Sequence, residues 1–302
     1  MNTSDGIDAA PRAARRTLSR RGVAAGVVLL LWLAGFSILA ARELFQGKVQ
    51  ELAQVGRLIE PGGDFYTVTR AGEQIGFMSA TADTFPYGIA LSQLLVTEHK
   101  VGRVLRRREV RTTVRLTHAM KLLGFTRQFG IDTTALVIAG EVHGDSSITI
   151  TTQAGSSEPR VRTVRITTPL LLPMEVPLAI ALGSTPKIGQ SYHYTVFDPV
   201  RLALGDATLR VVAESLFVLS DSATFDSTGG RWVAAHDTTV RAWRIEEPSG
   251  NSSLDAWIDA SGHLVETRRT GSLTLHRTAY ELAFENWSDA SKRQRRTLKN
   301  RP

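Results

Sequence analysis

The segment VRTTVRL at residues 110–116 carries the pattern that decides the fold. Two sets of side chains alternate along it. The first set is apolar or uncharged and comprises Val110, Thr112, Val114 and Leu116. The positions between them are polar and comprise Arg111, Thr113 and Arg115. Because successive side chains of a strand point to opposite faces of a sheet, this alternation predicts a strand with one buried and one solvated face.

Short extended runs of this kind continue on both sides of that segment. FYTVT at residues 65–69 and QIGF at 74–77 flank Ala71-Gly72-Glu73, which predicts a hairpin. Further strands are expected at 135–142, 147–152, 162–167, 191–196, 207–213, 231–236, 239–245, 254–258, 263–268 and 271–282. Strands this frequent, without alternating helices, predict a mainly β domain built as one large curved antiparallel sheet or half-barrel.

One apolar segment departs from the strand pattern. Residues 169–182, PLLLPMEVPLAIAL, contain three prolines and therefore do not fit a central strand. Pro177 suits the first turn of a short helix that ends at Gly183. This segment either covers the open face of the curved sheet or forms an exposed apolar lip that meets lipid or a partner. The candidate interaction residues on it are Leu170, Leu171, Leu172 and Met174.

Near the start of the chain lies an uncharged run, GVAAGVVLLLWLAGFSILAA at residues 22–41. Twenty residues of helix span about 30 Å, the thickness of the hydrocarbon core of a bilayer. The run therefore predicts a transmembrane helix, with Val27, Leu30, Trp32 and Phe36 among the anchor residues. A cleaved signal peptide and a buried core helix are the alternatives.

The charges flanking this run set the expected orientation and domain order. Five arginines precede it and fewer basic residues follow, so the positive-inside rule leaves residues 1–21 as a cytoplasmic basic arm. The remainder would lie in the periplasm of a bacterium, tethered to the inner membrane in a single pass. Residues 42–63 are expected to form a helical stalk and linker, followed by a β-rich domain at 64–287 and a disordered basic tail at 288–302.

The net charge of +7 does not indicate a nucleic-acid partner. Five arginines against two aspartates fall in residues 1–21, and six basic residues against one aspartate fall in residues 288–302. The body between these tails is close to neutral, whereas nucleic-acid binding needs a basic surface on the folded domain. The densest basic cluster of the body includes Arg106, Arg107 and Arg108, which either form a solvated hairpin or face lipid headgroups or an acidic partner.

Motifs for catalysis, metals and cofactors are missing from the sequence. The chain has no cysteine, which excludes disulfides, Cys-ligated zinc, iron–sulfur clusters and a thiol nucleophile. The seven histidines are scattered without metal-binding spacing, and no nucleotide-binding or serine-hydrolase motif occurs. The acidic turns at Asp198-Pro199 and Asp259-Ala260-Ser261-Gly262 are expected to cap their own backbone. We therefore expect no catalytic residue, metal or cofactor.

Three stretches support a family resemblance. FYTVTRAGEQIGF at 65–77, GQSYHYTVFDP at 189–199 and AWIDASGHLVETRRTG at 256–271 resemble the β-rich region that precedes the catalytic domain of bacterial membrane-bound transglutaminase-like proteins. The body is more loosely similar to the half-barrels of lipoprotein carriers (LolA/LolB-like). The resemblance implies a β-rich fold. It implies no activity, because the Cys-His-Asp set of the family's catalytic domain has no counterpart in this sequence.

Three non-catalytic functions are compatible with these features. The first is a membrane-anchored scaffold or accessory subunit that docks on other membrane proteins of an envelope or bioenergetic complex, such as a respiratory or photosynthetic one. The second is a periplasmic protein that binds a lipid or hydrophobic ligand in a cavity under residues 169–182. The third is an accessory module of a separately encoded transglutaminase-like enzyme. A hydrolase would need a convergent polar constellation, which the spacing of the residues does not indicate.

Overall fold

A computed structural model describes residues 61–102, 104–130, 134–144, 146–166, 169–247, 255–267 and 273–299. The expected transmembrane run at 22–41 and stalk at 42–60 lie outside these residues. Within the described part of the chain, no helix combines the length and the apolar character needed to cross a bilayer.

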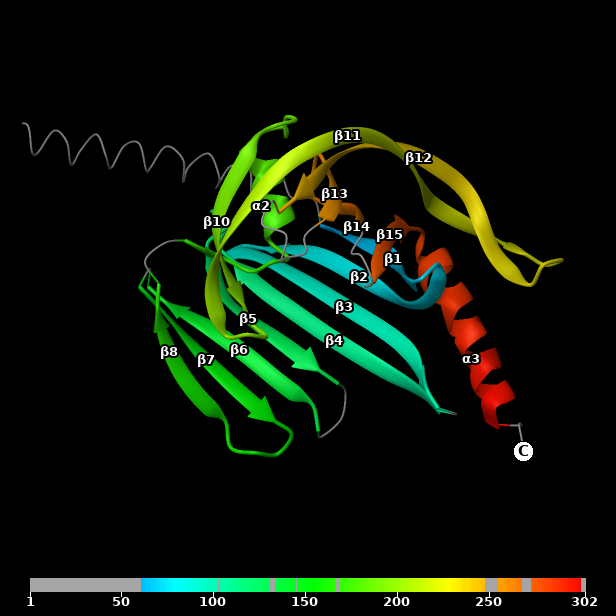
Figure 1. The fold of residues 1–302 in the computed structure, drawn as a ribbon, viewed down its shortest axis with the longest axis horizontal. Helices are drawn as coiled ribbons and strands as arrows, with labels where there is room; N and C mark the ends of the chain where they lie inside the picture. Colours follow the sequence, from blue (N-terminus) through cyan, green and yellow to red (C-terminus); the bar gives the residue numbers. More distant parts are fainter. Residues whose placement is uncertain are drawn as a thin grey trace, which may run out of the picture. The chain divides into compact units, whose positions relative to one another are not determined.

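The domain is one fifteen-stranded sheet with few helices (Figure 1). Its strands are β1 (Gly62–Arg70), β2 (Glu73–Phe85), β3 (Gly88–Val101), β4 (Val104–Leu116), β5 (Leu122–Phe129), β6 (Leu136–His143), β7 (Ser147–Ala154), β8 (Arg160–Arg165), β9 (Leu170–Leu171), β10 (Ser191–Asp198), β11 (Ala203–Asp226), β12 (Arg231–Glu246), β13 (Asp255–Asp259), β14 (Leu264–Thr267) and β15 (Thr274–Thr278). The helical elements are α2 (Val176–Gly183), the π-helix η1 (Glu281–Glu285) and α3 (Asn286–Lys299).

Strand order follows chain order in two meanders, β1 to β8 and β10 to β15. The antiparallel pairing of β1 with β15 joins them, so β8 and β9 form the two edges of an open, curved sheet. The expectation of one large curved sheet is confirmed. The β9–β10 pair is parallel, in contrast to the expected antiparallel pattern.

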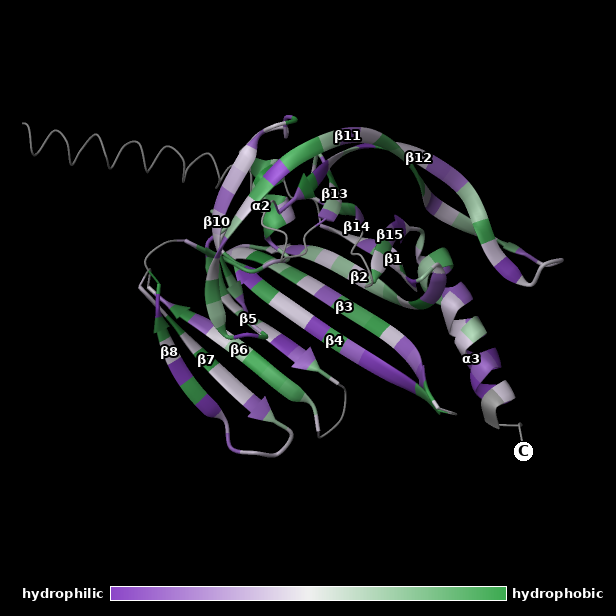
Figure 2. Ribbon diagram, viewed as in Figure 1, coloured by the Kyte–Doolittle hydropathy of each residue, from purple (hydrophilic) through white to green (hydrophobic). Residues whose placement is uncertain are grey.

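The alternation at residues 110–116 is confirmed in β4. Thr112, Val114 and Leu116 are buried, whereas Arg111 and Arg115 are exposed. Figure 2 shows the corresponding change of hydropathy along neighbouring strands. The hairpin at residues 65–77 is also confirmed, since Ala71 and Gly72 both have positive φ, 50° and 82°, as a tight β-hairpin turn requires.

Several strands differ from the expectation. β3 and β5 were not expected, and β12 is a single strand where two were expected at 231–236 and 239–245. The pairing of β12 with β11 continues past this point through register shifts near Ser220 and Ser222. The strand expected at 271–282 ends at Thr278, after which the chain turns into η1.

The short helix expected after Pro177 is confirmed as α2, which packs on the sheet between two apolar clusters. Leu170, Leu171 and Leu172 are all buried in these clusters. The exposed apolar lip is therefore wrong, because the leucines fill the space between α2 and the strands instead of facing solvent. Met174 is half-buried at the edge of the first cluster.

The disordered tail expected at 288–302 is also wrong, because residues up to Lys299 belong to α3. Trp287 packs against Phe77 of β2, with ring centroids 5.3 Å apart. One turn further, Ser291 donates a hydrogen bond of 2.5 Å to Glu98 of β3, and Arg295 pairs with the same carboxylate. Arg295, one of the basic residues of this segment, therefore attaches α3 to the sheet.

Candidate functional site

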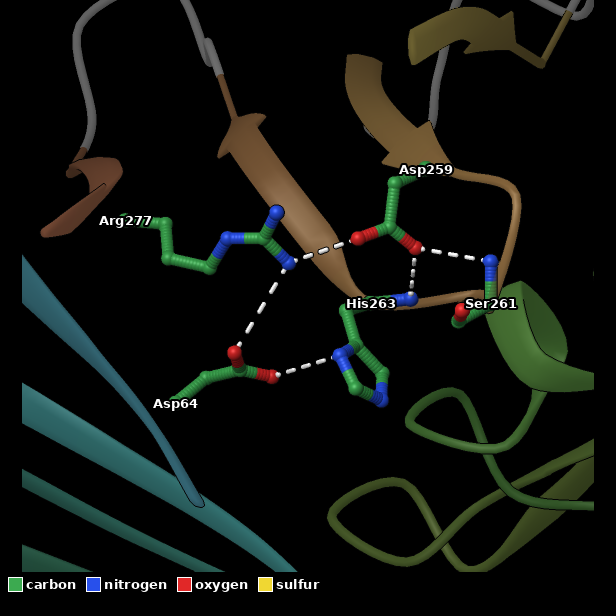
Figure 3. Close-up of polar contacts among 5 residues, drawn as sticks. All are labelled: Asp64, Asp259, Ser261, His263 and Arg277. Atoms are coloured by element: carbon green, nitrogen blue, oxygen red, sulfur yellow. Dashed lines mark hydrogen bonds and ion pairs between the residues drawn. The ribbon is translucent and has the colours of Figure 1, made fainter. Parts of the chain in front are cut away.

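Four charged or polar side chains meet where β1, β13, β14 and β15 come together (Figure 3). Arg277 Nη1 lies 2.7 Å from Asp259 Oδ2 and 3.7 Å from Asp64 Oδ1. His263 Nδ1 lies 3.2 Å from Asp64 Oδ2. We call this group, Asp64, Asp259, His263 and Arg277, the polar cluster.

Strand pairing brings the cluster together. Tyr66 of β1 stands opposite Arg277 of β15, and Asp64 lies two residues before Tyr66 on the same face. Asp259 is the last residue of β13, and His263 immediately precedes β14. Residues about 200 positions apart in the sequence thus share one site.

The turn after β13 fixes the position of His263. Asp259 Oδ1 accepts hydrogen bonds of 2.9 Å from the backbone N–H groups of Ser261 and His263, which confirms the expected capping role of this acidic turn. Gly262 has φ +80° and lies directly against α2, so that a Cβ there would come within 2.7 Å of Leu178 Cα. Only glycine fits this approach, and His263 is held beside α2 as a result.

Burial sets the electrostatics of Asp64 and Tyr66. Tyr66 is 1% exposed, and its hydroxyl donates a hydrogen bond to Asp64. Loss of solvation raises the pKa of Asp64, although His263 and Arg277 oppose this. Burial, followed by the charge of Asp64, raises the pKa of Tyr66, which keeps its proton available to the carboxylate.

An apolar cavity lies between α2 and the sheet, next to the cluster. The volume of this cavity that the centre of a water molecule can occupy is about 150 Å³. The walls come from β1, β2, β3, β14 and the segment that leads into α2, and include Tyr66, Ala80, Leu91, Met174, Leu178 and Leu264. Asp64 and His263 of the polar cluster also line the cavity, as do Thr81, Ser92, Gln93 and Thr267, so polar groups border a mainly apolar space.

A second space, a polar cleft, also borders Asp64 and His263. Its volume, measured in the same way, is about 540 Å³. The cleft is bounded by the start of β1, the end of β15 and the middle of the β11–β12 hairpin. Asp64 and His263 line both spaces.

The structure does not bring the sequence-predicted residues together with the cluster. Arg106, Arg107 and Arg108 are exposed on β4, where Arg107 lies 6.0 Å above the ring of Trp287 and 3.7 Å from Glu109. Leu170, Leu171 and Leu172 are core residues. Met174, by contrast, lines the cavity, as the hypothesis of a hydrophobic site under residues 169–182 requires.

The cluster itself was missed by sequence reasoning. Asp259 was recognised as a turn residue, but no local pattern links it with Asp64 or Arg277. Among the described residues, no group of three or more His, Asp or Glu side chains is arranged to hold a metal ion.

Comparisons with known proteins show a distant structural likeness to a protein of unknown function. No family model matches the chain, and no curated protein matches it. A crystal structure of a β-barrel-like protein of the domain of unknown function DUF1849, from Brucella abortus, aligns with 72% of this chain and 95% of its own length. The identity is 12% and the TM-score is 0.44, and nothing about function follows from it.

Proposed function

We propose that the domain is a non-catalytic binding protein that holds a small hydrophobic or amphiphilic molecule in the cavity beneath α2. The observation that carries this proposal is the mainly apolar cavity itself, which lies between α2 and the sheet, is partly open to solvent, and has Asp64 and His263 of the polar cluster among its lining residues. Apolar pockets with a few convergent polar groups are the usual form of small-molecule sites.

The pairing within the cluster supports binding over catalysis. Asp259 accepts two backbone hydrogen bonds and pairs with Arg277. Asp64 is contacted by Tyr66, His263 and Arg277. Because each charged group already has a protein partner, the proposal assigns the cluster no reaction; Asp64 and His263, which also line the cavity, are the members placed to contact a ligand.

The proposal places the domain in the bacterial periplasm, tethered to the inner membrane. This part rests on the sequence of residues 22–41 and on the charges that flank it. A tethered binding domain would have direct access to molecules that partition into the bilayer.

Extraction of bound molecules tests the proposal. The full chain is purified from bacterial membranes in mild detergent, and small molecules are extracted and quantified by mass spectrometry. Ala80→Phe fills the cavity, since Ala80 is part of its wall. We expect a bound molecule near one per chain in the unsubstituted protein and at least a fivefold loss in Ala80→Phe.

Ser79→Phe is the matched control. Ser79 is the neighbouring residue of β2 and faces the opposite side of the sheet. Lipid that adheres to the chain elsewhere is carried equally by both variants. Equal amounts of every extracted molecule in the unsubstituted chain, Ala80→Phe and Ser79→Phe would contradict the proposal.

A second candidate function, docking on another membrane protein, is favoured by the β11–β12 hairpin. Leu216 and Val218 lie on one face of β11 and are 65% and 64% exposed. Cross-linking in native membranes tests it: Leu216→Asp combined with Val218→Asp should abolish any specific cross-linked partner, whereas Ala80→Phe should leave that partner in place. An unchanged pattern in the double variant would reject docking at this surface.

A further inference from the structure

The apolar cavity and the polar cleft adjoin at Asp64 and His263, which line both. A ligand with an apolar part in the cavity would therefore present its other end to the cleft. The chemistry of the cleft then determines which polar group that end carries.

Negative charge predominates in this cleft. Four carboxylate side chains line it, namely Asp64, Asp221, Asp259 and Glu281. The basic groups on its wall are the guanidinium of Arg277 and the imidazole of His263. Arg277 is shared between Asp259 and Asp64, so it compensates only part of this charge. Neither lysine nor arginine lines the apolar cavity. Clefts lined by one sign of charge concentrate ligands of the opposite sign.

Asp221 contributes a negative charge to the cleft at neutral pH. Its carboxylate accepts hydrogen bonds from Thr238 and lies 2.8 Å from His236 Nδ1. These hydrogen bonds, first from Thr238 and then from His236, lower the pKa of Asp221 below its usual value. The side chain is exposed to the cleft and thus available to a ligand.

Aromatic rings complete the wall of the cleft. Tyr280 is 39% exposed and packs edge-on against Phe65, with ring centroids 5.1 Å apart. Aromatic faces attract ammonium groups through their quadrupoles. Carboxylates combined with aromatic rings thus favour a cationic group.

We infer that the ligand is a cationic amphiphile, whose alkyl or aryl part occupies the cavity beneath α2 and whose protonated amine lies at Asp64, facing the cleft. This inference rests on the proposed function and adds the charge of the ligand to it. A cavity with about the same accessible volume can hold a molecule as large as benzene. A six-carbon chain is therefore a suitable probe for the apolar part.

Hexylamine, hexanol and hexanoate, which share one alkyl chain, separate the role of charge from that of apolar contact. Each is titrated calorimetrically into the full chain in detergent micelles, and the heats measured with Ala80→Phe are subtracted to remove partition into the micelle. The dissociation constant of hexylamine should be at least tenfold lower than that of hexanol, and hexanoate should bind most weakly. Raising the salt concentration should weaken hexylamine alone.

Asp221→Asn tests the site without altering the buried cluster. Removing this exposed carboxylate should raise the dissociation constant of hexylamine about three- to tenfold and leave that of hexanol unchanged. Asp206→Asn, another exposed aspartate of β11 outside the cleft, is the control and should change neither value.

The outcomes distinguish the two proposals. Hexanol or hexanoate binding as tightly as hexylamine, or equal effects of Asp221→Asn and Asp206→Asn, would overturn the cationic ligand while leaving the cavity as a binding site. If none of the three probes shows binding that Ala80→Phe removes, both this inference and the proposed function fail.

Discussion

Two helices cover the sheet, and each buries a glutamate in a different way. Glu98 of β3 lies beneath α3, is 5% exposed, and is met by Ser291 and Arg295. Glu175 directly precedes α2 and is 0% exposed. Its Oε1 accepts one hydrogen bond of 3.2 Å from the Leu172 N–H, whereas its Oε2 has no hydrogen-bond partner among the described residues.

This difference separates a cover with a structural role from the cover to which we assign the proposed binding function. The α3 cover combines aromatic packing with a paired carboxylate, which fixes it firmly to the sheet. Helix α2 is apolar along its length, as Figure 2 shows. The carboxyl of Glu175, directly before it, is buried without a charged partner, and a cavity lies beneath the helix. A cover held by apolar contacts alone is compatible with the entry of a hydrophobic ligand.

Trp287→Ala should have the largest effect on stability. Trp287 is 6% exposed and packs on Phe77 and Phe284, so its truncation leaves a void in the α3 contact. We expect the unfolding free energy to fall by about 3 to 5 kcal/mol, measured by chemical denaturation of the full chain. A loss comparable to that of an exposed surface substitution would show that α3 is not part of the folded domain.

The pH dependence of Glu175 should come next. Burial raises its pKa from 4.5 to about 8, against the weaker effect of the Leu172 N–H. A carboxyl with a raised pKa in the folded state binds its proton more tightly there than in the unfolded chain. The contribution of Glu175 to the unfolding free energy is therefore most favourable below pH 4.5 and becomes less favourable as the pH rises toward 8. The loss between pH 4 and pH 7 should be on the order of 3 kcal/mol.

Glu175→Gln isolates this contribution from that of other titrating groups. The variant should match the unsubstituted chain near pH 4 and exceed it in stability near pH 7. Parallel stability curves for the two proteins from pH 4 to pH 8 would show that Glu175 is not buried as a neutral acid.

Asn286→Ala should have a smaller effect. Asn286, the first residue of α3, exchanges two hydrogen bonds of 2.9 Å with the backbone N–H and C=O of Trp232 near the tip of the β11–β12 hairpin. Their loss should cost about 1 to 2 kcal/mol and increase hydrogen exchange at the hairpin tip. Unchanged exchange at residues 225–235 would mean that α3 does not hold the hairpin.

Arg107→Ala should have the smallest effect. Its contacts with the ring of Trp287 and with Glu109 are made by an exposed side chain, and such contacts contribute about 0.5 kcal/mol or less. Arg106→Ala, on the opposite face of β4, is the control. If Arg107→Ala destabilised the protein as much as Asn286→Ala does, Arg107 would be a second polar residue, besides Glu98, that holds α3 on the sheet.

The sequence predicts elements whose signal is local. The alternation in β4, the Ala71-Gly72 turn and the proline that starts α2 each depend on a few neighbouring residues. β3 was missed because its buried positions are not confined to one face, which obscures a period of two. α3 was missed because its contacts with the sheet come from Trp287, Ser291 and Arg295, which share a helix face but not an apolar character.

The candidate site could not be predicted, because it depends on long-range strand pairing. Asp64 meets Arg277 only through the β1–β15 pair, and His263 meets Asp64 only through the tight turn against α2. The predicted hydrophobic site under residues 169–182 agrees in position with the cavity. Leu170, Leu171 and Leu172 are core residues, however, and the residues of this segment that line the cavity are Pro173, Met174, Pro177 and Leu178.

Photo-crosslinking tests the ligand cavity most directly. The full chain in detergent is irradiated with a neutral alkyl diazirine, and the modified residues are located by tandem mass spectrometry. The account predicts adducts on residues 173–178 and on the facing wall at Ala80 and Leu91, all lost in Ala80→Phe and retained in Ser79→Phe. Adducts confined to residues 22–41 or to the outer surface, with none on the cavity wall, would contradict it.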